Sequence, residues 1–236
     1  MPVPASIEDL LALQAPVPAD TVRAWLQSKR DLWLREPKLA SSGLKQLGAS
    51  PALATQALHA MQELGIEVNA FHTSAVLKSA EAASDWPLAL QLLQQSPQLR
   101  AAPNEFSYSI AMSACRRGQK SSEVLRLLKE MKEAKLQPNA ISFGTAVAAC
   151  RVAKLWEDAV DLVLQMRHEA LAPNLIVFSG AIGACGASGA WEVALGLLKE
   201  MESQEVWGDQ ICYSTVLSAC ERASAWAQGL ASWRQN

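Results

Sequence analysis

The chain has little histidine, little aromatic content and no marked excess of charge. Its 236 residues include three histidines, four phenylalanines and two tyrosines, and the formal net charge is -2. The near-neutral balance argues against a protein that coats nucleic acid by bulk charge, because a basic domain is the usual footprint of that mode. Half of the residues are apolar and 19% are charged. This excludes a disordered chain, because that much apolar surface can offset the entropy lost on folding.

Targeting and membrane signals are also missing. Glu8, Asp9 and Asp20 precede the first arginine, Arg23, whereas presequences are Arg-rich and acid-poor and secretory signals begin with basic residues before an apolar run. The longest uncharged stretch, 170–191, is long enough to span a bilayer, but Pro and Gly residues interrupt it. A regular repeat explains this stretch better, so we expect no membrane partner.

Cysteine and histidine show no metal-site pattern. The five cysteines include no CxxC pair, which favours free thiols in a reducing compartment over a disulfide framework. His59, His72 and His168 share no metal-ligand spacing, so we expect no metal, and for His72 we expect a solvated position. Four of the cysteines are 35 residues apart, at positions 115, 150, 185 and 220.

Other residue types follow the same 35-residue period. An Asn or Asp column lies at 69, 104, 139, 174 and 209, a Met column at 61, 131, 166 and 201, and a Trp column at 86, 156, 191 and 226. Pro103, Pro138 and Pro173 each precede one of the Asn residues. Independent columns that share one period indicate an array of structural repeats.

Each repeat has the pattern of two helices. In the unit that begins at residue 140, apolar residues recur at helical spacing over 143–150 and again over 156–166. Pro173 ends the second helix, because the residue before a proline disfavours the α region, and Asn174 is placed to cap the next helix. A two-helix unit cannot bury its apolar face alone, so neighbours must stack. The sequence therefore predicts an all-α fold, an α-solenoid of antiparallel helix pairs.

The period also predicts the organisation of the chain. Full units are expected at 70–104, 105–139, 140–174 and 175–209, followed by a partial fifth unit at 210–236. Residues 35–69 have the pattern of a degenerate unit, because Pro37 and Lys38 at the start of its first helix depart from the repeat pattern. Residues 1–34 are expected to form an N-terminal helical cap, with Trp25 and Trp33 covering the first exposed face of the array.

This repeat resembles the pentatricopeptide repeat family of the P type, which has 35-residue helical pairs with a Pro-Asn or Pro-Asp junction. Residues 105–115 resemble the opening helix of such a unit, and 191–201 resemble its second helix. The closest rival, the 34-residue tetratricopeptide repeat, has a W-x2-L-G-x2-Y pattern that is absent here. The resemblance covers about 35–236 and implies a right-handed superhelix.

The resemblance implies binding of single-stranded RNA, one base per repeat. In the family, each base is read by a reading pair, which consists of the residue five after one junction Asn and the junction residue that closes the unit. Here the reading pairs are Ser74 with Asn104, Ser109 with Asn139, Gly144 with Asn174, and Ser179 with Asp209. The residues two after each junction clamp the bases in the family, and here they are Phe71, Phe106, Ile141, Ile176 and Ile211.

The chemistry of the reading pairs gives a base preference. An Asn amide offers a donor and an acceptor, which match the edge of adenine, whereas an ionised Asp only accepts and suits the donor-rich edge of guanine. The family code gives the same assignment for a small hydroxyl residue with Asn or Asp. The expected preference is A, A, A, G from 5′ to 3′, and Gly144 leaves the third base least determined because it has no side chain.

Structural roles compete with these assignments. Each Asn could act only as a helix cap, although capping and base reading can coexist. The apolar residues at the clamp positions could be ordinary core, which their exposure would decide. For the periodic cysteines we expect small core residues rather than disulfides or metal ligands, and for the periodic tryptophans we expect packing between repeats.

The charge distribution is uneven along the array. Unit 105–139 has seven basic and four acidic residues, a net charge of +3, whereas unit 175–209 has one basic and five acidic residues, a net charge of -4. Phosphate contacts supply much of the affinity for nucleic acid, so we expect weak, salt-sensitive binding. The alternative is a helical scaffold for protein–protein interaction without RNA specificity. The candidate phosphate contacts are Arg116, Arg117, Arg151 and Arg222.

No motif in the chain indicates catalysis. Some family members carry a deaminase-like domain, which needs H-x-E and C-x-x-C zinc ligands, and neither motif occurs here. We expect no enzymatic activity, cofactor or small-molecule substrate. The resemblance implies single-stranded RNA and RNA-processing proteins as partners and a mitochondrion or plastid as location. Without a visible presequence, the cytoplasm and nucleus stay open.

Overall fold

The computed structural model describes residues 7–12, 17–99 and 101–223. Over these residues the chain forms thirteen helices and no strand, which confirms the all-α prediction. The part of the predicted fifth unit beyond residue 223, with Trp226, lies outside the described residues. The helices are α1 (Ile7–Leu11), α2 (Ala19–Arg35), α3 (Pro37–Leu47), α4 (Pro51–Glu63), α5 (Ala70–Ala82), α6 (Trp86–Gln95), α7 (Glu105–Arg117), α8 (Ser121–Glu133), α9 (Ala140–Ala153), α10 (Trp156–His168), α11 (Leu175–Ser188), α12 (Trp191–Ser203) and α13 (Gln210–Arg222).

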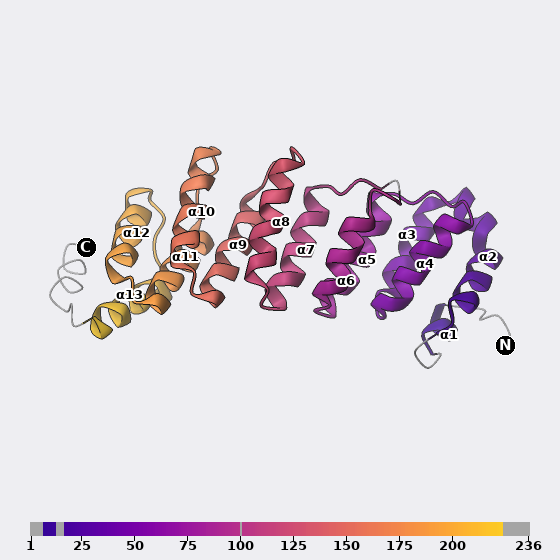
Figure 1. Cartoon of the computed structure of the whole chain (residues 1–236), viewed down its shortest axis with the longest axis horizontal. Helices are drawn as coiled ribbons and strands as arrows, with labels where there is room; N and C mark the ends of the chain where they lie inside the picture. Colours follow the sequence, from indigo (N-terminus) through magenta and orange to yellow (C-terminus); the bar gives the residue numbers. More distant parts are fainter. Residues whose placement is uncertain (1–6, 13–16, 100, 224–236) are drawn as a thin grey trace. The chain divides into compact units, whose positions relative to one another are not determined.

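The chain divides into two compact units, Met1–Gly118 and Gln119–Asn236. In the N-terminal unit, α5 packs against α3 on one side and α7 on the other (Figure 1). Helix α4 packs against α3 and α5, and α6 packs against α5 and α7. Each second helix therefore covers the first helix of its own repeat and that of the following repeat.

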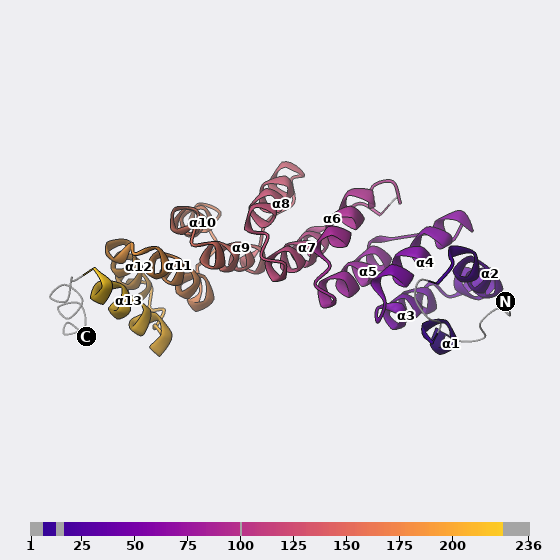
Figure 2. The ribbon, with the colours of Figure 1, turned by 60° about the horizontal axis from the view of Figure 1, so that its bottom comes forward.

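The C-terminal unit repeats this arrangement. Helix α11 packs between α9 and α13, while α10 contacts α9 and α11, and α12 contacts α11 and α13. Figure 2 shows the first helices α9, α11 and α13 in one layer and the second helices α8, α10 and α12 in the other. The predicted stack of antiparallel helix pairs is thus present within each unit.

A common turn ends the second helices α4, α8, α10 and α12, and the column Met residues within these helices are completely buried. A residue with positive φ follows each of these four helices, and the next N–H donates to the backbone carbonyl of the column Met, for example from Leu136 to Met131 and from Leu171 to Met166. This six-to-one hydrogen bond is the Schellman way of closing a helix. The residues with positive φ are 35 residues apart, at Lys135, Ala170 and Glu205 with φ of 58, 56 and 58°, and Gly65, with φ of 72°, holds the equivalent place after α4.

The periodic cysteines lie in the core, as expected. Cys115, Cys150 and Cys185 have no exposed surface, and Cys220 is 1% exposed. Burial raises the pKa of the Cys150 thiol to about 12 and that of Cys185 to about 11. These thiols are therefore protonated at neutral pH and behave as small apolar core residues, because the thiolate is the reactive form.

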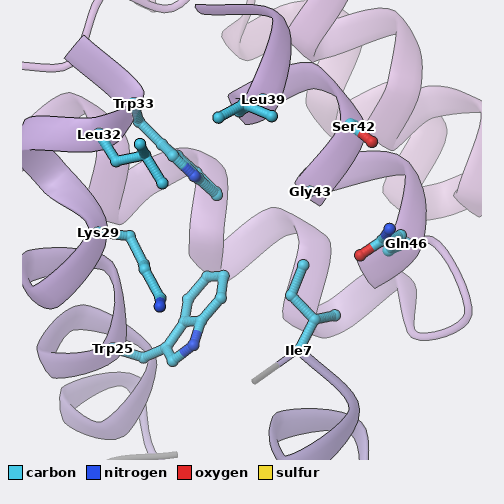
Figure 3. Close-up of a pocket in the computed structure, with 9 residues that line it drawn as sticks. All are labelled: Ile7, Trp25, Lys29, Leu32, Trp33, Leu39, Ser42, Gly43 and Gln46. Atoms are coloured by element: carbon cyan, nitrogen blue, oxygen red, sulfur yellow. The ribbon is translucent and has the colours of Figure 1, made fainter. Parts of the chain in front are cut away.

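Two tryptophans cover the first side of the array. Trp25 and Trp33 on α2 are buried, and their rings meet edge to face with centroids 5.7 Å apart. Trp33 lies so close to Gly43 that a Cβ there would sit 2.8 Å from its ring. Figure 3 shows both rings lining a pocket of about 360 Å³, together with Ile7 of α1. Helix α2 packs against α3 and α4.

Trp86 shows the predicted packing between repeats. It starts α6 and lies directly against Gly118 at the end of α7, where a side chain would collide with the indole ring. Among the described helices, none combines the length and the apolar character needed to cross a membrane. The uncharged stretch 170–191 instead contains the 14-residue helix α11.

Candidate nucleic-acid interface

The junction residues cap the first helices, as the sequence predicts. In each case an extended junction residue accepts a hydrogen bond at its side-chain Oδ1 from a backbone N–H in the first turn, as is typical of an N-cap. Asp209 is an acceptor in the same way as the four Asn residues. The bonds are Asn69 from Phe71 and His72 (3.0 and 3.2 Å), Asn104 from Ser107 (2.9 Å), Asn139 from Ile141 and Ser142 (3.0 Å each), Asn174 from Val177 (3.1 Å), and Asp209 from Cys212 (2.9 Å).

The caps use only one polar atom of each junction side chain. The caps use Oδ1, so the two amide N–H donors of each Asn take no part in them. Asn69, Asn104 and Asn174 are exposed, while Asn139 and Asp209 are half-exposed. The junction side chains are therefore at the surface rather than in the core.

Asp209 differs from the Asn residues in its charge. Hydrogen bonds from the backbone N–H and the thiol of Cys212 hold the pKa of this carboxyl below its usual value of 3.8. A carboxylate that accepts such bonds is stabilised in its charged form. Asp209 is therefore ionised at neutral pH and offers acceptors alone, which is the chemistry expected to suit guanine.

Ser107 connects the first reading pair. Ser74 is 7% exposed, and its Oγ lies 3.5 Å from that of Ser107. Ser107 in turn donates from its Oγ to Oδ1 of Asn104 at 3.0 Å. The two members of the pair are therefore linked through one buried hydroxyl, which restricts the position of both side chains.

Cys212 occupies the corresponding place in the fourth reading pair. Its thiol lies near both members, because the Asp209 side chain raises its pKa and the Ser179 side chain lowers it. Ser107 and Cys212 each come three residues after a junction, a position that the sequence reasoning did not single out. A signal was present in the sequence, because Ser107 and Ser142 are polar residues on the apolar stripe of a helix.

The other two pairs differ from these. Gly144 has no side chain, and the nearest atom to a Cβ built there is Cγ2 of Val177, at 3.9 Å. An apolar residue thus replaces the polar link between Gly144 and Asn174. Ser109 belongs to the N-terminal unit, where its Oγ donates to the carbonyl of Glu105 at 2.9 Å, and Asn139 belongs to the C-terminal unit.

The five clamp residues are the most exposed large apolar residues of the first helices. A core residue would be almost completely buried, so their exposure favours a surface role. Lys78 adds a charge here, with its Nζ 5.7 Å from the centre of the Phe106 ring. The exposed fractions are 79% for Phe71, 54% for Phe106, 69% for Ile141, 70% for Ile176 and 61% for Ile211.

Two of the candidate phosphate contacts share a pocket in the C-terminal unit. Arg151 lies against Gly183, and Arg222 donates to the carbonyl of Gly186 at 2.5 Å. Both line a pocket of about 500 Å³, together with the hydroxyl residues Ser214, Thr215 and Ser218. In the N-terminal unit, Arg116 is half-buried and Arg117 exposed in the last turn of α7.

Many of the other charges belong to the second helices. Lys132 pairs with Glu169 at 2.7 Å, and Arg167 pairs with Glu200. These pairs join consecutive second helices of the C-terminal unit. The uneven charges of the repeats are therefore partly matched across neighbours, away from the junctions.

The prediction for His72 was wrong. Its side chain is 1% exposed, and its Nδ1 accepts the backbone N–H of Asn69 at 3.3 Å, which completes a capping box with the Asn69 side chain. The histidine lies three residues after the junction, where the structure places buried polar residues. Among the described residues, no group of three or more His, Cys, Asp or Glu is placed to hold a metal ion.

These features are those of a helical repeat protein. Its repeats present a polar junction residue that caps a helix, followed two positions later by an exposed apolar residue. Sequence comparison identifies the family. Residues 106–136 and 176–206 match the pentatricopeptide repeat, and 126–188 match the pentatricopeptide repeat domain. The chain therefore contains pentatricopeptide repeats, which these matches place over 106–206. A search of curated proteins found no match.

Solved structures of this family have the same fold. The protein PPR10 in complex with an 18-nucleotide psaJ RNA element matches 96% of the chain with a TM-score of 0.58 and 21% identity, and the chain spans 38% of that structure's length. The pentatricopeptide repeat domain of Arabidopsis thaliana protein-only RNase P 1, in complex with tRNA, matches 88% of the chain and 99% of its own length, with a TM-score of 0.61 and 14% identity. The nuclear RNase P 2 of A. thaliana matches 77% of the chain and 41% of its own length, with a TM-score of 0.64 and 13% identity.

Proposed function

We propose that the chain binds single-stranded RNA in a sequence-specific way, with one base per repeat. The observation that carries this proposal is a regular arrangement in which a helix-capping Asn or Asp at the surface is followed two positions later by an exposed apolar residue. Such an arrangement offers a hydrogen-bonding group and an apolar contact to each unpaired base. Two of the similar structures contain bound RNA, which supports the same class of ligand here.

The preferred sequence in this proposal is A, A, A, G, read from the N-terminal full repeat. Asn104, Asn139 and Asn174 present amide donors toward adenine, and Asp209 presents acceptors to the donor-rich edge of guanine. Arg116, Arg117, Arg151 and Arg222 contact phosphates. Because these cations are few and the chain has a net charge of -2, binding is weak, and its phosphate contacts make it salt-sensitive.

The proposed mechanism is passive. A bound RNA segment is held extended, so that nucleases and competing base pairing are blocked or an RNA-processing protein is recruited. No catalytic step is assigned to the chain itself, and its proposed location, by family resemblance, is a mitochondrion or plastid. Two of the similar structures belong to RNase P proteins, so cleavage of bound RNA is checked in the same experiments.

Binding to short labelled RNAs tests the proposal. Fluorescence anisotropy at low salt would compare an oligonucleotide that contains AAAG in a uridine background with an all-uridine control of equal length. We expect the AAAG sequence to bind at least about tenfold more tightly, a difference of about 1.4 kcal/mol. Gel analysis of the same samples would show intact RNA.

The second candidate function is a protein-binding scaffold. The acidic repeat 175–209, with a net charge of -4, favours it because that repeat repels phosphate. Equal binding of both oligonucleotides, or no binding at low salt, would support the scaffold and contradict the RNA proposal.

A further inference from the structure

The first helix of the repeat before residue 70 is shorter than those that follow. Helices α3 and α5 begin at Pro37 and Ala70, which are 33 residues apart, but they end at Leu47 and Ala82, which are 35 apart. The second helices α4 and α6 begin at Pro51 and Trp86, again 35 apart. The repeat therefore lacks two residues, and they are missing from its first helix.

Burial shows which residues of α3 and α5 are equivalent. The buried residues of α3 are Ala40, Gly43, Leu44 and Leu47. A shift of 33 residues places all four on buried residues of α5, namely Thr73, Val76, Leu77 and Ala80. A shift of 35 residues places only Leu44 on a buried residue. Each residue of α3 is therefore equivalent to the residue of α5 that lies 33 positions later.

A pocket in the N-terminal unit is lined by residues of α3 and α5 that follow the same 33-residue spacing. Its volume is about 680 Å³, and both α3 and α5 line it. Three residue pairs in its lining are 33 apart: Ser41 with Ser74, Ser42 with Ala75, and Lys45 with Lys78. Phe71 and Phe106, the two exposed clamp residues of this unit, also line it, and so does Asn69.

The residue that a 35-residue register would select lies elsewhere. Leu39 would then be equivalent to Ser74, but Leu39 lines the pocket beside Trp33 (Figure 3). It is not part of the lining of the pocket that contains Ser74. The geometry therefore assigns the place equivalent to Ser74 to Ser41.

We propose that residues 37–69 form a shortened repeat that binds one further nucleotide, with Ser41 and Asn69 as its reading pair. This inference rests on the proposed function and extends the recognised RNA by one base at its 5′ end. Ser41 supplies a hydroxyl, Asn69 an amide, and Phe71 an exposed ring that stacks on the base. Lys45, at the same place as Lys78, contacts a phosphate of the same nucleotide step.

Adenine is the base expected at this position. The pair has the same two residue types as Ser74 with Asn104, and Asn69 caps α5 through Oδ1 as Asn104 caps α7. Its amide N–H donors are likewise outside the cap. The recognised sequence then becomes AAAAG.

Four RNAs of the form NAAAG in a uridine background, with N as each base in turn, test the additional site. For the unaltered chain we expect adenine at N to bind about tenfold more tightly than guanine or either pyrimidine. Asn69→Asp keeps the cap, because Asn and Asp are equally good there, and should change the preference at N from adenine to guanine. Equal binding of all four RNAs would overturn the inference.

Asn104→Asp is the matched control for the proposed function. It should change the preference at the following base from adenine to guanine and leave N unchanged. If Asn104→Asp has this effect and Asn69→Asp changes nothing at N, the additional site is wrong while the proposed function holds. If neither variant changes a base preference, the proposed function itself fails.

A second pair of variants tests the register directly. Ser41→Ala should reduce the preference for adenine at N severalfold, whereas Leu39→Ala should leave it unchanged. Circular dichroism would show that both variants are folded. The opposite result, an effect of Leu39→Ala alone, would restore the 35-residue register and overturn the assignment of Ser41.

Discussion

The first and fourth reading pairs lie in different units of the chain and differ mainly in one functional group. Ser74 with Asn104 is linked through the Ser107 hydroxyl, and the Cys212 thiol lies near both Ser179 and Asp209. The backbone geometry and the cap are shared, but one pair ends in an amide and the other in a carboxylate. The comparison teaches that the repeat holds the two positions constant and that the chemistry of one side chain can vary between them.

Exchanging the two junction residues should give the largest effect. Asp209→Asn should change the preference at the fourth base from guanine to adenine, and Asn104→Asp should do the reverse at the first. The reason is that an amide donates and accepts while a carboxylate only accepts. We expect the ratio of guanine to adenine affinity to change by about a hundredfold, in line with about 1–3 kcal/mol for one base contact.

Competition binding with RNAs that differ only at the base in question would measure this ratio. Asn and Asp both cap helices, so thermal unfolding of each variant should match the unaltered chain. Unchanged base preferences in both variants would contradict the reading role of these two residues.

The third pair offers a gain of function. Gly144→Ser would supply the hydroxyl that this pair lacks, and it fits because the nearest atom to the new Cβ would be 3.9 Å away. We expect adenine at the third base to be preferred about tenfold more strongly than in the unaltered chain. Preference measurements at the other bases serve as the control, and a uniform increase for all four bases at the third position would contradict the reading role.

Removing the linking side chains should have a smaller effect. Ser107→Ala and Cys212→Ala would each release one reading pair, at a cost of about 1 kcal/mol for a lost hydrogen bond, which is roughly a fivefold loss of base preference. Cys212→Ser retains a hydrogen-bonding group and should retain the preference at the fourth base. A loss that is equal for every RNA sequence would indicate a purely structural role instead.

Acidification should have the smallest effect on the guanine preference. The pKa of Asp209 lies below its usual value of 3.8, so the carboxylate is ionised at neutral and mildly acidic pH. Its contribution to the cap of α13 is present above the unfolded value and is lost as the pH falls through the lower folded pKa. Binding titrations from pH 8 to about pH 5 should therefore show a constant preference, and a decline within that range would contradict the lowered pKa.

Much of the fold could be predicted because the periodic residues have separate physical reasons to recur. The cysteine column is small and buried, the Met column is buried in the core, and the junction column caps the first helices. The residue three after a junction was harder to predict, as His72 shows. That histidine has a polar side chain but lies in the core, because its ring nitrogen completes the cap of its own helix.

By itself, the sequence determined the repeat, its helix pairs, the caps and the family, because these depend on spacing along the chain and on local hydrogen bonds. Packing in three dimensions placed Ser107 and Cys212 beside the members of a reading pair, and aligned α3 with α5 at 33 residues rather than 35. Both depend on which side chains of neighbouring helices meet. Because α3 is two residues shorter, a fixed 35-residue spacing misaligns it with α5, and only the packing of the two helices shows which residues are equivalent.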